Sequence, residues 1–393
     1  MSVARVSRSR GFWSAVALLS LPVLLLAWVM FYHYGAFFWD AKAYSCGIEA
    51  MRLTGNPNDY QGACQTYAWQ YMYPPAVTAL LVGLTAPIAP ALQVAGYGGL
   101  YLVAVGLWVR VTCAQAPDAM LAVLATLLCA CGVFAYEMAT GNLAMVVAAL
   151  MVCSVPHAKR GWIGLLAVAL VAALFKPHYA LYFLVPALVR RNLLLLAASS
   201  LALTLWYFAD ALRNDAAFDR WLSEIFGIIY GETHFGLLKL LELAGFGEGA
   251  WQAQFLLYGL WCLLLLGVLW RVGRPLADPG ERGWLALLVA TLMFPRLKEY
   301  DMLVLVPLMF WLANRLRGSL RRSYCGAVIA LGFVLPWSWW AGRKLLWLSR
   351  TGELSLQTVT DLRWLVQMQG WFLAALERQG KLGASCRVQV PVG

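Results

Sequence analysis

The chain has 393 residues, of which 62% are hydrophobic and only 12% are charged, and its mean hydropathy is +0.69. This composition excludes a water-soluble globular protein with an ordinary polar surface and indicates a polytopic membrane protein. The net charge of +11 is spread over the ends of the apolar runs, which is typical of the positive-inside rule, so we expect no nucleic-acid-binding surface.

The first predicted element is an uncleaved membrane helix over residues 11–32. Arg5, Arg8 and Arg10 precede it. The apolar run is longer than the core of a signal peptide and lacks a small-residue cleavage site. The N-terminus is therefore expected in the cytoplasm.

The apolar runs fall into two length classes, because a hydrocarbon core of about 30 Å needs about 20 helical residues. Runs that meet or nearly meet this length cover residues 11–32, 118–136, 193–209, 251–270 and 324–340. Shorter runs cover residues 142–155, 161–175, 178–189, 283–294 and 302–314. Helices this short need neighbouring helices or a water-filled cavity at their ends. Together the runs predict an all-α fold of about 11–13 transmembrane helices in one membrane domain over residues 1–393.

Basic clusters set the predicted orientation. The clusters at residues 159–160, 190–191, 271–282 and 315–322 are expected in the cytoplasm.

The two long polar loops, 33–73 and 210–250, then face outward. Between residues 74 and 136 the runs give three apolar segments where alternation requires two or four, and a short re-entrant element in 74–90 would restore the count. Loop 210–250 contains two stretches typical of interfacial helices, and a basic region over 341–393 follows the last clear span.

Two cysteines differ from the others. Most of the cysteines lie in apolar runs and are expected to be packing residues. Cys46 and Cys64 both lie in the outer loop, where an oxidising compartment would permit a disulfide. The sequence leaves this pairing open, and without a CxxC or His/Cys cluster we predict no metal site.

Asp40 is the first candidate for chemistry. It follows an aromatic run and precedes a helical stretch that carries Lys42 and Tyr44. Its structural role would be the N-cap of a surface helix. Its functional role would be a general base at the membrane edge, where partial desolvation raises carboxylate basicity. The sequence leaves both roles open.

A second group of candidates is cationic. Lys176 and His178 flank a proline between two apolar runs, and a lone lysine there is commonly a snorkelling anchor. Alternatively, Lys176 converges with Arg296 and Lys298 on one anion, since charges at membrane depth are costly and indicate function. A lipid-linked phosphate suits such donors. Neighbouring residues that would orient the cations or an acceptor hydroxyl are Glu299, Tyr300 and Asp301.

The order of these motifs resembles the GT-C superfamily of integral-membrane glycosyltransferases, and within it glycosyltransferase family 87. The matching residues are Asp40 with Tyr44, Gly55-Asn56-Pro57, Tyr73-Pro74-Pro75, Gly141-Asn142, Lys176-Pro177 and the segment from Pro295 to Asp301. The resemblance implies that Asp40 is the catalytic base and that the Lys176 and Arg296 regions bind the donor phosphate. Several family members carry a histidine in the late segment, and this chain has none there.

The function implied is transfer of a sugar, mannose or arabinose, from a polyprenyl-phosphate donor to a lipid or glycan acceptor. The reaction would run with inversion at the outer face of the cytoplasmic membrane, and no cofactor is expected. A carrier or flippase for a lipid-linked sugar or anion would use the same cations to line a pathway. An inactive assembly subunit is a third possibility.

Overall fold

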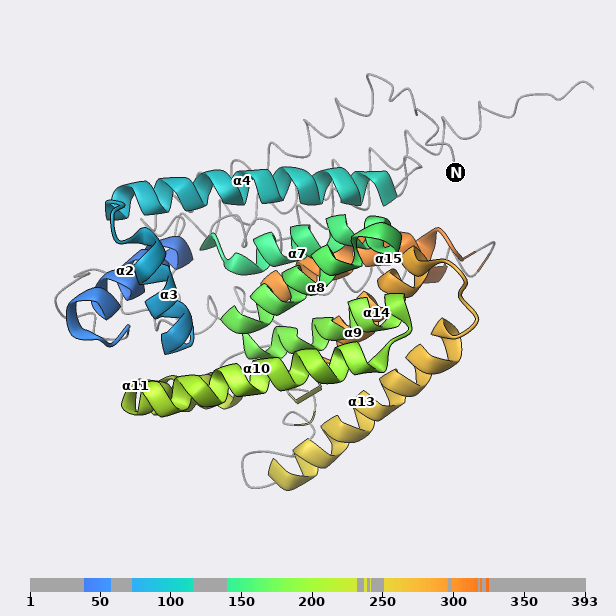
Figure 1. Ribbon diagram of the computed structural model, residues 1–393. Helices are drawn as coiled ribbons and strands as arrows, with labels where there is room; N and C mark the ends of the chain where they lie inside the picture. The colour runs from blue at the N-terminus through green and yellow to red at the C-terminus, as the bar shows by residue number, and fades with distance from the viewer. Residues whose placement is uncertain are drawn as a thin grey trace, which may run out of the picture. The chain divides into compact units, whose positions relative to one another are not determined.

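The structure is a computed structural model that describes residues 39–57, 73–115, 140–231, 237–238, 241, 251–295, 299–316, 319 and 323–324. These residues form helices and turns, and no strand occurs among them, which confirms the predicted all-α class (Figure 1). The chain divides into two units, Met1–Cys325 and Gly326–Gly393, and every described residue belongs to the first.

Four helical stretches are long and apolar enough to cross a membrane. Three of them lie in α4 (Pro90–Gln115), α10 (Leu193–Arg213) and α13 (Trp251–Gly273). The last two confirm the predicted runs at 193–209 and 251–270. The predicted spans at 11–32, 118–136 and 324–340 lie outside the described residues, so the total of about 11–13 helices stays a prediction.

The fourth stretch, Leu143–Phe175, is a hairpin of two helices. It contains α7 (Leu143–Ser154), the 3₁₀ turn η1 (Val155–His157) and α8 (Ala158–Phe175). A straight helix of this length would separate its ends by about 50 Å. Instead Lys176, just after α8, hydrogen-bonds to Asn142, just before α7. The two short runs predicted at 142–155 and 161–175 are therefore separate antiparallel helices.

Four short helices form the interior of the part of the chain that the structure describes. Most side chains of α7, α9 (Leu184–Arg190), α14 (Pro279–Leu292) and α15 (Leu305–Ala313) are buried. In contrast, α4, α10 and α13 expose large apolar side chains such as Leu102, Leu194 and Leu263, and Figure 1 shows them flanking the short helices. The long helices thus present apolar surface outward, and the short ones are enclosed by protein, as their lengths predict.

Three further helices lie beside these buried and exposed helices. They are α2 (Trp39–Thr54), the short α3 (Pro75–Thr85) and α11 (Asp215–Gly231). With 11 residues, α3 is too short to cross a membrane, as expected for the 74–90 segment, although its re-entrant placement stays a prediction. The helix α11 confirms that the first of the two stretches predicted in loop 210–250 is helical; its place at the membrane interface stays a prediction.

The helix ends separate into two groups. We call one the basic end: there Arg191 donates to the carbonyls of Arg274 and Leu276, and Arg282 donates to that of Leu188. Glu281 and Arg315 form an ion pair at the same end. The other we call the polar end, and its members are Asp40, Asn142, Lys176, Asp210 and Asp301.

Candidate active site

Asn142 organises the polar end. It follows Gly141, whose φ of 65° favours glycine, and it is the N-cap of α7 with extended backbone angles. Its Oδ1 accepts a hydrogen bond from the Ala144 backbone N–H at 2.9 Å, which satisfies a donor that the helix leaves without a partner. The cap therefore fixes the orientation of the Asn142 amide.

This amide joins a carboxylate to an ammonium group. Lys176 Nζ donates to Asn142 Oδ1 at 3.0 Å, and Asn142 Nδ2 donates to Asp40 Oδ2 at 2.6 Å. Lys176 is only 8% exposed, so its charge lies away from bulk solvent. Asp40 and Lys176 are 136 residues apart in the chain, yet in the structure a single side-chain amide separates them.

Tyrosines form one wall of the site. The Tyr44 hydroxyl oxygen accepts from the Tyr73 hydroxyl at 2.8 Å and from the Leu143 backbone N–H at 3.1 Å, while Tyr97 donates to the Gly141 carbonyl at 2.9 Å. Desolvation, followed by the proximity of Tyr73 and Asp40, raises the pKa of Tyr44 well above its ordinary value. Tyr44 therefore stays a neutral phenol beside Asp40.

A second carboxylate lies near the same cation. Asp301 is 3% exposed and accepts a hydrogen bond from the Tyr179 hydroxyl at 2.8 Å. His178 Nε2 lies 3.9 Å from the same carboxylate oxygen. Burial alone would raise the pKa of Asp301, but His178, Lys176 and the Tyr179 hydrogen bond outweigh it, and the pKa is lowered. Asp301 is therefore ionised at neutral pH.

Tyr179 contacts both Asp301 and Lys176. It was not predicted from the sequence. Lys176 Nζ lies 5.7 Å from the centre of its ring, at a cation–π distance. The 3₁₀ helix η2 (Pro177–Phe183) explains the arrangement, because residues three apart lie above one another in a 3₁₀ helix. The same spacing stacks Tyr179 on Tyr182 at 5.4 Å. A proline directly after Lys176, followed by an aromatic two residues later, was the available signal.

The side chains of four predicted site residues are not described by the structure. Arg296 and Lys298 lie outside the described residues. Glu299 and Tyr300 open the 3₁₀ helix η4 (Glu299–Val304), but their side chains are not among those described. Convergence of Arg296 and Lys298 on Lys176 therefore stays a prediction.

Two structural predictions can also be placed. Asp40 lies in the first turn of α2, which begins at Trp39, rather than directly before the helix as an N-cap would. Cys46 is disulfide-bonded; Cys64 lies outside the described residues, so their pairing stays a prediction.

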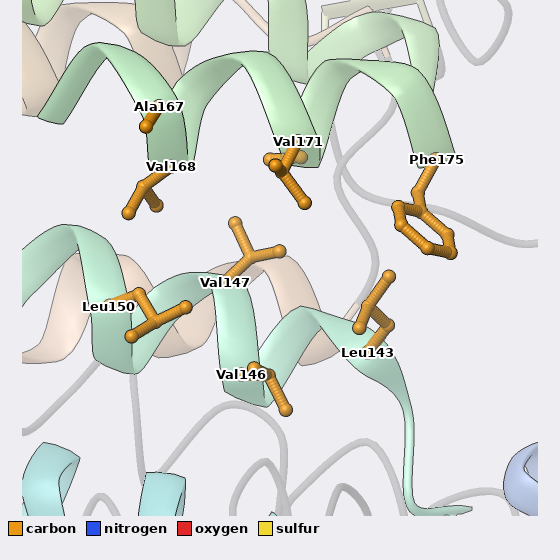
Figure 2. Close-up of a pocket in the computed structure, with 9 residues that line it drawn as sticks. Leu143, Val146, Val147, Leu150, Ala167, Val168, Val171 and Phe175 are labelled. Atoms are coloured by element: carbon orange, nitrogen blue, oxygen red, sulfur yellow. The ribbon is translucent and has the colours of Figure 1, made fainter. Parts of the chain in front are cut away.

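An apolar groove of about 220 Å³ runs between α7 and α8. Figure 2 shows its two walls, with Val147 and Leu150 on α7 facing Val168 and Val171 on α8. Within the described part of the chain, no group of three or more His, Cys, Asp or Glu side chains is arranged to hold a metal ion.

Comparison with known proteins gives no match: no family model, no curated protein and no solved structure is significantly similar to this chain. The function of the chain is therefore inferred from its sequence and from the geometry of the site.

Proposed function

We propose that the protein is a membrane glycosyltransferase that moves a sugar from a polyprenyl-phosphate donor to a lipid or glycan hydroxyl. In this proposal Asp40 is the general base. It takes the hydroxyl proton as the oxygen attacks C1 of the sugar. The bond between C1 and the phosphate oxygen breaks, and its electron pair leaves with the polyprenyl phosphate, so that the configuration at C1 is inverted.

One observation carries the proposal: Asp40 and Lys176 contact opposite ends of the same Asn142 amide. A displacement at C1 needs a proton acceptor near the attacking oxygen and a cation near the departing one. The width of one amide spaces these two groups. A cation at the leaving phosphate interacts more strongly with the transition state, where negative charge develops, than with the bound donor.

His178 and Asp301 fit a supporting part in the same reaction. The imidazole Nε2 of His178 lies 3.9 Å from the Asp301 carboxylate, and in this proposal His178 lies beside the donor phosphate. Asp301, in the late segment from Pro295 to Asp301, thus lies near a histidine, His178, from a different part of the chain. Mannose and arabinose remain the sugars that the family resemblance implies, and the outer face of the cytoplasmic membrane remains the proposed location.

The competing function is a carrier for a lipid-linked sugar or an anion. Buried Lys176 would suit an anion pathway, and a nearby carboxylate would suit a carrier coupled to protons. Only the transfer reaction requires a proton acceptor and a cation at one short, fixed spacing. The arrangement of Asp40, Asn142 and Lys176 therefore favours the enzyme.

The test is a reconstituted assay with purified protein in lipid nanodiscs and a radiolabelled polyprenyl-phosphate sugar. An enzyme converts the label to a new glycolipid or glycan and releases free polyprenyl phosphate. In proteoliposomes a carrier moves intact labelled donor across the bilayer without breaking a bond. Transport of unmodified donor with no product would reject the proposed reaction.

A further inference from the structure

The groove between α7 and α8 ends at Asn142 and Lys176 of the polar end. Leu143 and Phe175 line one end of it (Figure 2). Leu143 directly follows Asn142, and Phe175 directly precedes Lys176. The hairpin therefore places an apolar channel and a buried ammonium group next to each other.

Among the described residues, the groove opens outward rather than into the buried core. Val171 and Leu150, on its opposite walls, are 54% and 40% exposed. In a membrane protein such a groove admits a hydrocarbon chain from the side. All nine of its lining residues are apolar, so nothing along it would hold a polar segment.

The dimensions fit part of a single chain. From Leu143 to Leu150 the groove follows α7 over about 10 Å. Its volume is below the roughly 300 to 1,000 Å³ of pockets that enclose whole drug-sized ligands.

We infer that the groove holds the first part of one polyprenyl chain, with the phosphate of that lipid at Lys176. This inference rests on the proposed function, of which it locates the donor. A cation at one end and apolar walls along the rest are complementary to a single-chain lipid with an anionic head. The sugar, attached beyond the phosphate, would then lie on the side of Asn142 and Asp40.

The experiment measures binding of a long-chain polyprenyl phosphate, without sugar, to the full chain in nanodiscs. Val171→Trp fills the groove from its exposed wall and is expected to weaken binding about tenfold, which corresponds to about 1.4 kcal/mol. Ile163→Trp is the matched control, since Ile163 is 64% exposed on the same helix and does not line the groove. It is expected to bind as the wild type does.

Two further ligands make the result specific. A prenyl phosphate with a single isoprene unit is too short to fill the groove, so its weaker binding should not change in Val171→Trp, whereas Lys176→Ala should weaken both ligands. Phosphatidylglycerol should not compete at equal concentration. Unchanged long-chain binding in Val171→Trp, equal loss in both Trp variants, or equal competition by phosphatidylglycerol would overturn the inference.

Failure here is distinguishable from failure of the proposed function, because binding is measured without transfer. Selective weakening in Val171→Trp together with no glycosyl product would keep the lipid site and reject the enzyme. Normal transfer and normal long-chain binding in Val171→Trp would keep the enzyme and reject the groove.

Discussion

At the scale of single residues, Asn142 shows why an amide occupies the centre of the site. Its oxygen accepts from Ala144 and Lys176, and its nitrogen donates to Asp40. A side-chain amide has a strong acceptor and a strong donor on one rigid group, and asparagine is the shorter of the two residues that carry one. A carboxylate at this position would repel Asp40, and a hydroxyl is too short to span both charged neighbours.

The proposed base can be tested by Asp40→Asn. Asparagine retains an oxygen that can accept from Asn142 Nδ2, so folding is expected to be close to normal, but it cannot take a proton at neutral pH. Transfer should fall by at least about a hundredfold while polyprenyl-phosphate binding is kept. Initial rates and donor binding are measured on the same preparation.

Glu49→Gln is the control for this change, because Glu49 lies on the same helix and pairs with Arg52 on the exposed surface. Loss of an exposed pair has little effect on stability. Near-normal turnover in Asp40→Asn would assign the base elsewhere.

The contact between Asn142 and Asp40 can be tested by Asn142→Asp. Aspartate still caps α7, but it brings a second carboxylate against Asp40, and the pair then titrates at raised apparent pKa values. The rise of kcat/KM with pH should move to higher pH, and the rate at neutral pH should fall. The measurement is the pH profile of transfer.

Asn192→Asp provides a matched comparison, because Asn192 caps α10 in the same way, with its Oδ1 accepting from the Leu194 N–H at 3.0 Å. Its profile should match the wild type. If the Asn142→Asp profile also overlays the wild type, Asn142 has only a capping role.

Asp301 predicts a pH dependence of stability. Because its pKa is lowered in the folded state, the ionised group stabilises the fold above the ordinary Asp pKa of about 3.9. This contribution is lost as the pH falls through the lowered value. Thermal unfolding should show Asp301→Asn less stable than wild type at pH 6, with the difference shrinking below about pH 4. A difference that stays constant over this range would show that ionisation of Asp301 is not its source.

The sequence predicted the residue types of the site better than their partners. Asp40 and Lys176 stood out because charged groups are rare in an apolar chain, and Asn142 was named only through the family resemblance. That Asn142 lies between the other two depends on the α7–α8 hairpin and on α2 packing beside it, and neither contact has a local signal. Gly55, which the family resemblance also included, has a structural role. Its φ of 74° and the hydrogen bond from its N–H to the Met51 carbonyl end α2.

At the scale of helices, length predicted position. The short runs at 142–155, 178–189, 283–294 and 302–314 became mostly buried helices, and the long runs at 193–209 and 251–270 became exposed ones. The short run at 161–175 is an exception, because α8 exposes Ile163 and Val171. The pair Lys159 and Arg160 between two apolar runs marked the hairpin turn. What length could not predict is which helix ends meet, since that is decided by tertiary contacts such as Tyr207 donating to the Ala173 carbonyl.

One such contact predicts a loss of stability. The N-terminus of α3 has no capping side chain of its own; instead Asp210 of α10, only 1% exposed, accepts from the Ala76 N–H through both carboxylate oxygens at 3.1 Å. Asp210→Ala leaves this N–H without its acceptor and should cost about 1–3 kcal/mol. The melting temperature in detergent should fall, and Asp210→Asn should recover part of it.

Asp219→Ala is the control, because it makes the same substitution at an exposed position of α11. It should leave the melting temperature nearly unchanged. If Asp210→Ala melts like Asp219→Ala, the contact between α10 and α3 does not stabilise the protein.

At the scale of the whole molecule, the two ends of the helices differ in charge, with clustered Lys and Arg at the basic end. The hairpin places Lys159 and Arg160 at the opposite end from Lys176, and α10 runs from Asn192, beside the arginines of the basic end, to Asp210 at the polar end. Four helical stretches with apolar composition lie between these ends. Since cytoplasmic loops carry the excess of Lys and Arg, we expect the basic end in the cytoplasm and the polar end outside.

This orientation is tested by reporter fusions at three positions. Asn58 follows α2, and Glu232 follows α11, both helices of the polar end; residue Ala277 lies between α13 and α14 at the basic end. Alkaline phosphatase, which is active only outside the cytoplasm, should be active at Asn58 and Glu232 and inactive at Ala277, and a fluorescent protein that folds in the cytoplasm should show the reverse pattern. The reversed pattern at all three positions would place the site in the cytoplasm. A split between Asn58 and Glu232 would contradict the structure itself, because Asp210, near the start of α11, contacts Ala76 of α3, which packs against α2.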